Sequence, residues 1–174
     1  DMMDGGIGKG VRVVSVEIEP LLRTLDNRVI QRPWNFAFMK DALVELLSFL
    51  TRQELCALLR LPSVSADSRY QDGIQQAAQW LADELGRLGL ATELIATAGH
   101  PLVYAESPPV PGAPTVLVYG HYDVQPPDPV NEWLTPPFEP AVRNGHLYAR
   151  GATDDKGQVL THIKGAQAWL ATTG

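Results

Sequence analysis

The most regular feature of the chain is a helical spacing of apolar side chains over residues 71–88. Apolar residues lie on one face of this segment, and Gln, Asp and Glu residues lie on the opposite face. Gly89 follows at the position where a left-handed residue commonly ends a helix. The same spacing predicts a helix over residues 157–170. Residues 40–61 predict either two consecutive helices or one bent helix, which ends before Pro62.

Other segments carry the pattern of β-strands. Residues 91–97 and 102–106 flank a short turn, and residues 141–150 predict a hairpin that turns at an Asn-Gly pair. Residues 116–119 are wholly apolar, which predicts a strand that is covered on both faces. Because helices alternate with strands, we expect the fold class to be an α/β sandwich.

Length and charge limit the classes of function that remain. A chain of 174 residues with 45% hydrophobic and 20% charged residues suits one globular domain. Its net charge of -6 argues against nucleic acid and anionic membrane surfaces as partners, since both attract basic proteins. No apolar segment is long enough to cross a bilayer, and the acidic N-terminus does not resemble a secretory signal. We therefore expect a cytoplasmic protein.

The first 38 residues and the single cysteine carry no readable chemistry. Residues 1–38 follow no clear pattern and are interpreted as an N-terminal extension, so the domain is expected to span residues 39–174. Cys56 lies among Leu and Ala residues, which indicates a buried core position rather than a nucleophile. One cysteine also excludes a disulfide within the chain.

Polar side chains with metal-binding chemistry follow the predicted strand at residues 116–119. His121 comes where ligands bind in α/β sheets, beyond the carboxyl end of a strand. Asp123 lies two residues further on, so in an extended backbone both side chains point to the same side. A carboxylate there would fix the imidazole tautomer and improve it as a metal ligand. A catalytic histidine base would need a nucleophile, and no Gly-x-Ser-x-Gly elbow is present, which favours the metal interpretation.

A second group of carboxylates precedes the predicted helix at residues 157–170. Asp154 and Asp155 would stabilise the start of that helix, because helix N-termini favour negative charge. A carboxylate can also bridge two metal ions through its two oxygens. For an isolated Asp-Asp pair, capping is the more common role. Both interpretations therefore stay open on these residues alone.

Three motifs, taken in order, resemble one enzyme family. GHYDVQPPDP (120–129), EWLTPPFEP (132–140) and NGHLYARGATDDKG (144–157) resemble the dinuclear-zinc metallopeptidase superfamily of the carnosinase, glutamate carboxypeptidase and aminoacylase type. The bacterial dipeptidase branch is the most similar. LPSVSADS (61–68) also looks like an early segment of that family. The resemblance runs from about residue 39 to the end of the chain.

The resemblance implies a fold and a site. The fold would be the N-terminal part of a catalytic domain, a three-layer α/β sandwich with a mixed sheet, without its second half and its lid and dimerisation domain. By similarity, His121 would bind one zinc ion, Asp123 would be a catalytic carboxylate that supports it, and Asp154 would bridge two zinc ions. The peptide bond between Asp154 and Asp155 would be cis, and Asp155 would serve local structure. Cobalt or manganese could replace zinc.

The implied activity is zinc-dependent hydrolysis of an amide bond in dipeptides or small peptides. The family's proton-transferring Glu-Glu pair and later metal ligands have no counterpart after Gly157, where no carboxylate remains. We therefore expect an N-terminal fragment that is inactive alone, binds zinc weakly and self-associates through uncovered apolar faces. The full-length protein would be a homodimer. Alternatives are an N-acyl-amino-acid deacylase of the same superfamily and a non-catalytic relic domain that acts through partners.

Overall fold

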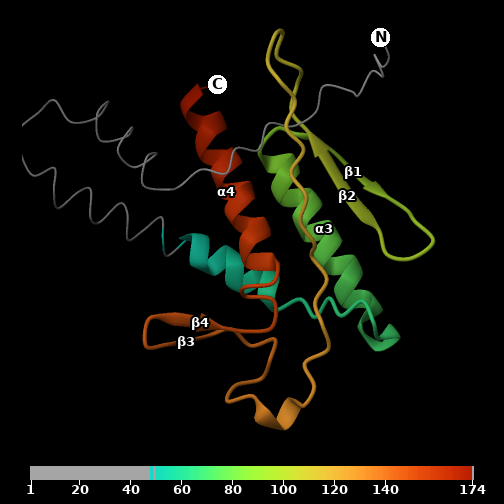
Figure 1. The fold of residues 1–174 in the computed structure, drawn as a ribbon, viewed down its shortest axis with the longest axis vertical. Coiled ribbons are helices and arrows are strands. Elements are labelled where there is room, and N and C mark those ends of the chain that lie inside the picture. The colour runs from blue at the N-terminus through green and yellow to red at the C-terminus, as the bar shows by residue number, and fades with distance from the viewer. Residues whose placement is uncertain (1–47, 49, 174) are drawn as a thin grey trace, which may run out of the picture.

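The computed structural model describes residue 48 and residues 50–173, which form helices with two small antiparallel sheets beside them (Figure 1). In chain order the elements are a helix over residues 50–59, the 3-10 turn η1 (Ser68–Tyr70), α3 (Gln71–Arg87), β1 (Ala91–Ile95), β2 (Leu102–Glu106), the 3-10 turn η2 (Val130–Glu132), β3 (Ala141–Arg143), β4 (His146–Tyr148) and α4 (Lys156–Thr173).

The helices agree with the periodic patterns. The predicted helix over residues 71–88 is α3, and Gly89 follows it with a φ of 79°, so the predicted left-handed end is confirmed. The helix predicted over residues 157–170 is α4. Residues 50–59 are helical, whereas the predicted helical residues before position 48 lie outside the described part of the chain, as does the proposed 1–38 extension.

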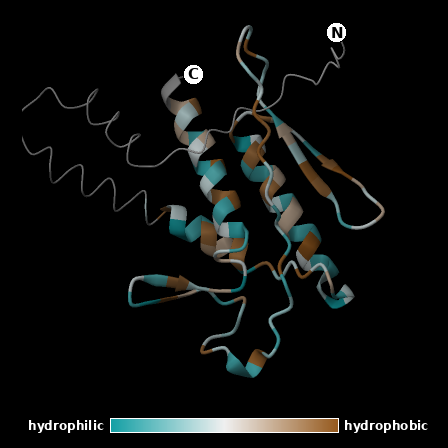
Figure 2. Cartoon of the chain, in the orientation of Figure 1, coloured by the Kyte–Doolittle hydropathy of each residue, from teal (hydrophilic) through white to brown (hydrophobic). Residues whose placement is uncertain are grey.

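The core lies where the apolar faces of three helices meet. Leu58, Leu81 and Ile163 are buried against one another, and each comes from a different helix. On its other side α3 packs against β1 and β2, and the apolar stretches of these elements are visible in Figure 2. Cys56 is buried, as predicted. Burial of apolar surface is the main driving force for this packing.

Both predicted hairpins form. β1 and β2 pair antiparallel, with Ala91 opposite Glu106. β3 and β4 pair antiparallel through the turn at Asn144 and Gly145, whose φ values are 50° and 79°. Two successive residues with positive φ define the tight hairpin turn that an Asn-Gly pair favours. Within the described residues, no helix is long and apolar enough to span a bilayer.

The predicted strand at residues 116–119 is wrong. This segment has no strand partner within the described residues, and Leu117 and Tyr119 are 83% and 84% exposed. A strand that is covered on both faces needs hydrogen-bonded neighbours and two packed layers, which its own sequence cannot supply. The expected three-layer sandwich with a mixed sheet is likewise not formed by the described residues, whose two sheets are separate, two-stranded and antiparallel.

Candidate metal centre

The segment that carries His121 is held against the LPSVSADS segment. Val64 and Val124 form a parallel β-bridge, and the Val124 N–H donates to the Ser63 carbonyl at 2.8 Å. The Ser63 hydroxyl donates to the Tyr122 carbonyl at 2.6 Å and is fully buried. These contacts fix the backbone of residues 122–124, next to His121.

The start of α4 approaches the other side of this segment very closely. A Cβ atom at Gly120 would lie 2.6 Å from Cγ2 of Val159 in α4, so only glycine fits without displacement. The Asp155 carboxylate accepts a hydrogen bond from the His121 backbone N–H at 3.1 Å. Asp155 therefore links α4 to the backbone of the site, which agrees with the local structural role expected for it.

Lys156 anchors the same helix start to the interior. Its side chain is fully buried, and its Nζ donates to the carbonyls of Leu58 at 3.1 Å and Leu61 at 2.6 Å. Burial lowers the pKa of Lys156 to about 7, although the charge of Asp123 acts in the opposite direction. The lysine thus adds a side-chain donor to two carbonyls at the end of the helix over residues 50–59, which also accept the backbone N–H groups of Leu61 and Ser63.

His121 lies between two carboxylates. Its Nδ1 is 3.2 Å from Oδ1 of Asp123 and 3.1 Å from the carbonyl oxygen of the same residue. Its Nε2 is 3.0 Å from Oδ1 of Asp154. The structure thus brings together all three residues that the sequence predicts for the site. The contacts place the ring with one nitrogen toward Asp123, whose side chain is 41% exposed, and the other toward Asp154, whose side chain is 79% exposed.

The surroundings change the pKa of His121. Partial burial lowers it, but the Asp123 carbonyl, the Asp154 carboxylate and the charges of Asp123 and Asp155 outweigh burial, so the net pKa is raised above 6.5. The peptide bond between Asp154 and Asp155 is cis, as the resemblance implied. This geometry belongs to the short segment that joins Asp154 to the start of α4.

The residues present fit part of a zinc site. Zinc accepts histidine nitrogen at about 2.0–2.1 Å and carboxylate oxygen at about 2.0–2.2 Å, so two such ligands of one tetrahedral ion lie roughly 3.4 Å apart. The 3.0 Å separation between Nε2 of His121 and Oδ1 of Asp154 is shorter than this spacing by a few tenths of an ångström. In the described part of the chain, no group of three or more His, Cys, Asp or Glu side chains is placed to hold a metal ion.

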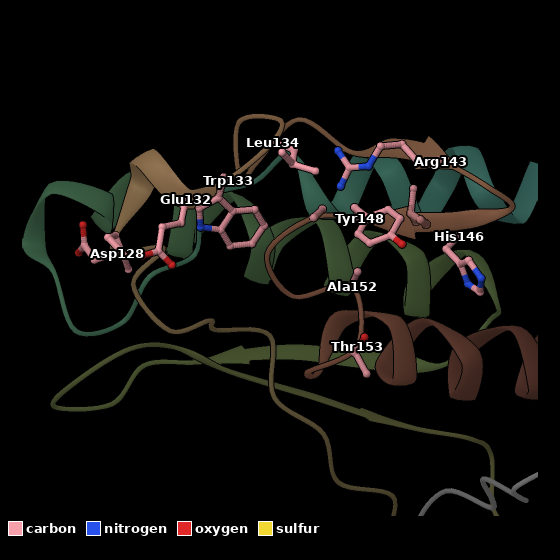
Figure 3. A pocket seen from close by; sticks show the side chains of 12 residues that line it. Asp128, Glu132, Trp133, Leu134, Arg143, His146, Tyr148, Ala152 and Thr153 are labelled. Atoms are coloured by element: carbon pink, nitrogen blue, oxygen red, sulfur yellow. The ribbon is translucent and has the colours of Figure 1, made fainter.

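A cleft of about 800 Å³ begins beside the site (Figure 3). It lies between the loop that contains η2 and the β3–β4 hairpin, and it reaches Thr153, the residue before Asp154. Trp133 forms part of one wall, and Arg143 stacks over the ring of Tyr148 at 4.1 Å on the hairpin side. His146 begins β4 and lines this cleft.

The other histidines stay apart from the candidate ligands. His162 lies within α4 and is half-buried. His100 points its Nε2 toward the Ser65 carbonyl at 3.1 Å. Neither has a contact with His121 or Asp154 among the interactions of the described residues. His121 is thus the histidine that the fold places beside Asp154.

Sequence reasoning did not assign roles to Ser65, Gly120 and Lys156. The Ser65 hydroxyl donates to Oδ2 of Asp123 at 2.5 Å. All three residues lie inside the quoted motifs, and this position is the one feature of the sequence that links them to the site. Their partners, however, lie far away along the chain. Ser65 and Asp123 are 58 positions apart, Lys156 and Leu58 are 98 positions apart, and Gly120 meets Val159 in α4, so no local pattern reports these pairings.

Comparison with known proteins gives consistent relatives. The profile of peptidase family M20/M25/M40 matches residues 117–174. Succinyl-diaminopimelate desuccinylase of Xylella fastidiosa (strain M23) is 38% identical over 116 residues, which are 67% of this chain and 29% of that protein. The Cys-Gly metallodipeptidase dug1 of Schizosaccharomyces pombe is 34% identical over 131 residues, which are 69% of this chain and 27% of that protein.

A solved structure agrees with the sequence relatives. Human carnosine dipeptidase 1 has a similar fold, with a TM-score of 0.68 and 32% identity over 75% of this chain and 30% of that chain. The present chain therefore spans less than a third of the length of each of these proteins. The similarity covers the part that contains His121, Asp123 and Asp154.

Proposed function

We propose that this chain forms one side of an active site that hydrolyses an amide bond, because it belongs to the M20/M25/M40 peptidase family of metallohydrolases. The observation that carries the proposal is the 3.0 Å contact between His121 Nε2 and Asp154 Oδ1, with Nδ1 of the same ring directed at Asp123. Zinc, when bound, supplies an activated water and polarises the substrate carbonyl.

The residues of this chain hold and orient rather than transfer protons. His121 would hold a zinc ion through Nε2, and the Asp154 carboxylate would be shared between that ion and a second one. Asp123 would accept a hydrogen bond from Nδ1–H of His121. The proton then stays on Nδ1, and the lone pair of Nε2 is available to the metal. The group that moves a proton from water to the leaving amine would have to come from residues other than these three.

The substrate is proposed to be a dipeptide or small peptide. The Cys-Gly metallodipeptidase and carnosine dipeptidase among the relatives favour this class. The alternative is an N-acyl amino acid, which the succinyl-diaminopimelate desuccinylases favour with an identity of 38%, against 34% for the Cys-Gly metallodipeptidase. The cleft beside Thr153 has both acidic and basic side chains in its walls, and this mixture suits either substrate.

A hydrolysis assay tests the proposed activity. The 174-residue chain and the product of its complete reading frame would be incubated with Cys-Gly, carnosine and N-succinyl-diaminopimelate, with zinc, cobalt or manganese. We expect the chain alone to be inactive and the longer product to cleave a dipeptide, with loss of activity in Asp123→Ala. Preferential cleavage of the succinyl compound would favour the deacylase alternative. No metal-dependent hydrolysis of any of the three would contradict the proposal.

The relic alternative and the assembly state need separate observations. A stop codon directly after position 174, without a Glu-Glu pair or late histidine downstream, would favour a non-catalytic domain that acts through partners.

We propose a homodimer for the full-length protein, with small peptides as its ligands and a cytoplasmic location. Sedimentation of the longer product would test the dimer, and a monomer would contradict it.

A further inference from the structure

The two oxygens of the Asp123 carboxylate are held by different partners. Oδ2 accepts the hydroxyl of Ser65 at 2.5 Å, and Oδ1 lies 3.2 Å from Nδ1 of His121. A distance near 2.5–2.7 Å is typical of a hydroxyl that donates to an ionised carboxylate, and such bonds are stronger than those between neutral groups. The carboxylate therefore connects the LPSVSADS segment directly to the imidazole ring.

The Ser65 backbone is fixed independently of this hydrogen bond. The preceding residue, Val64, forms the parallel bridge to Val124 and is buried. The Ser65 carbonyl lies 3.1 Å from Nε2 of His100, and the Tyr122 hydroxyl donates to the Pro101 carbonyl at 2.5 Å. The hydroxyl of Ser65 thus comes from a segment whose position does not depend on Asp123.

A carboxylate with only one partner is poorly oriented. The terminal torsion of an Asp side chain has a broad, roughly two-fold distribution, so one contact with a ring nitrogen would leave the carboxylate plane free to rotate. A second bond from a fixed hydroxyl removes this freedom and keeps Oδ1 in line with Nδ1. Ser63, two residues earlier, differs because its hydroxyl binds a backbone carbonyl and reaches no side chain of the site.

We propose that Ser65 is a positioning residue of the metal centre. It holds the Asp123 carboxylate, which together with the Asp123 carbonyl faces Nδ1 of His121, so that the ring keeps its proton on Nδ1 and presents Nε2 to the metal. This inference rests on the proposed function for its purpose, but the contact it describes involves only residues of this chain. Ser65 acts through Asp123 and does not itself touch the metal or the substrate.

The test measures the ring nitrogens of His121 by long-range ¹H–¹⁵N NMR in the metal-free chain at pH 8. In the native protein we expect the tautomer with the proton on Nδ1. In Ser65→Ala we expect a shift toward the tautomer with the proton on Nε2, where Asp154 is the alternative acceptor. Ser65→Thr keeps a hydroxyl and should restore the native signals. If Ser65→Ala leaves both ring signals unchanged, the inference is overturned.

Controls separate positioning from loss of structure. Ser68→Ala changes an exposed serine in the same loop region and should leave the ring signals unchanged. Ser63→Ala should lower stability with a smaller change in tautomer. If Ser65→Ala does not fold, Ser65→Cys, which has similar size but a weak donor, takes its place in the comparison. Native ring signals in a folded Ser65→Cys variant would then overturn the inference.

A zinc titration of the same samples separates this inference from the proposed function. We expect the zinc dissociation constant to rise about tenfold in Ser65→Ala, because groups that orient a metal-bound histidine typically contribute that much or more. If zinc leaves the native ring signals unchanged, the proposed function fails, while the comparison of tautomers still decides the role of Ser65. If zinc binds the native protein and Ser65→Ala equally with identical ring signals, the positioning role is excluded.

Discussion

At the scale of single residues, the site depends on the orientation of one imidazole ring. His121 has Asp123 on its Nδ1 side and Asp154 on its Nε2 side. The residue types and their H-x-D spacing could be predicted from the sequence, since they follow from ligand chemistry. The supports of this arrangement, Ser65 and Lys156, could not, because their contacts depend on how distant segments pack.

Asp123→Asn tests the support of the ring. An amide cannot match a carboxylate as acceptor of the Nδ1 proton, so Nε2 becomes a poorer ligand. We expect the zinc dissociation constant to rise about 10- to 100-fold, measured by competition with a chromogenic chelator. Asp72→Asn, an exposed change in the first turn of α3, should leave the constant unchanged. Equal affinity of the native chain and Asp123→Asn would rule out this role.

The raised pKa of His121 predicts two effects of pH. In the metal-free chain, its folded pKa lies above the unfolded value of 6.5, so its contribution to stability is complete below that value and is lost as pH rises through the folded pKa. Zinc competes with the proton on Nε2, so zinc affinity should decrease as pH falls through the same range. Zinc affinity that stays constant between pH 8 and 5 would contradict the assignment.

The buried Lys156 predicts that stability increases with pH, which is opposite to the effect of His121. Its folded pKa of about 7 lies below the unfolded value of 10.5. The unfolded state therefore binds more protons between these values, and the free energy of unfolding should increase with pH by up to about 1.4 kcal/mol per pH unit. Urea unfolding of Lys156→Met should lack this slope. A slope that is equal in both proteins would mean that another group causes it.

At the scale of elements, the helices followed their apolar periodicity while the apolar strand did not form. The pattern over residues 71–88 is satisfied by one buried face, which β1, β2 and the helix core cover. Residues 116–119 need neighbouring strands on both edges, and no described segment provides them. A helix closes its own hydrogen bonds, whereas a strand depends on partners that its sequence does not specify.

The close approach of α4 to the site segment predicts opposite effects for two glycine substitutions. Gly120→Ala places a Cβ atom 2.6 Å from Val159 and should lower the free energy of unfolding by about 1–3 kcal/mol. Gly86→Ala, in α3 with no atom within 4 Å of the added Cβ, should raise it by roughly 0.5–1 kcal/mol. Denaturant unfolding measures both changes. A neutral Gly120→Ala would contradict the observed packing.

At the scale of the whole molecule, apolar side chains stay exposed next to the site. Leu117 and Tyr119 belong to an extended segment that no described strand or helix covers. Composition alone does not report this, because 45% hydrophobic residues is ordinary for a globular chain. The aligned part of this chain covers only 29% and 30% of two of its relatives, which is consistent with further covering structure in proteins of this family.

The exposed segment predicts self-association of the chain. Leu117→Lys combined with Tyr119→Lys should shift the sedimentation profile toward monomer, because charge on an unpaired extended segment opposes edge-to-edge pairing. Val110→Lys, an exposed change in the proline-rich connection, should leave the profile as it is in the native chain. A native chain that sediments as a monomer and melts cooperatively would refute the prediction.

The most direct test of the metal site is the zinc affinity of the chain when its histidines are replaced one at a time. The chain has four histidines, and we expect only His121, together with Asp154, to bind zinc. Calorimetric titration should show weak binding that is lost in His121→Ala and reduced in Asp154→Asn, and unchanged in His146→Ala and His162→Ala. Two tightly bound zinc ions in the native chain would refute its expected inactivity. Unchanged binding in His121→Ala would contradict the site itself.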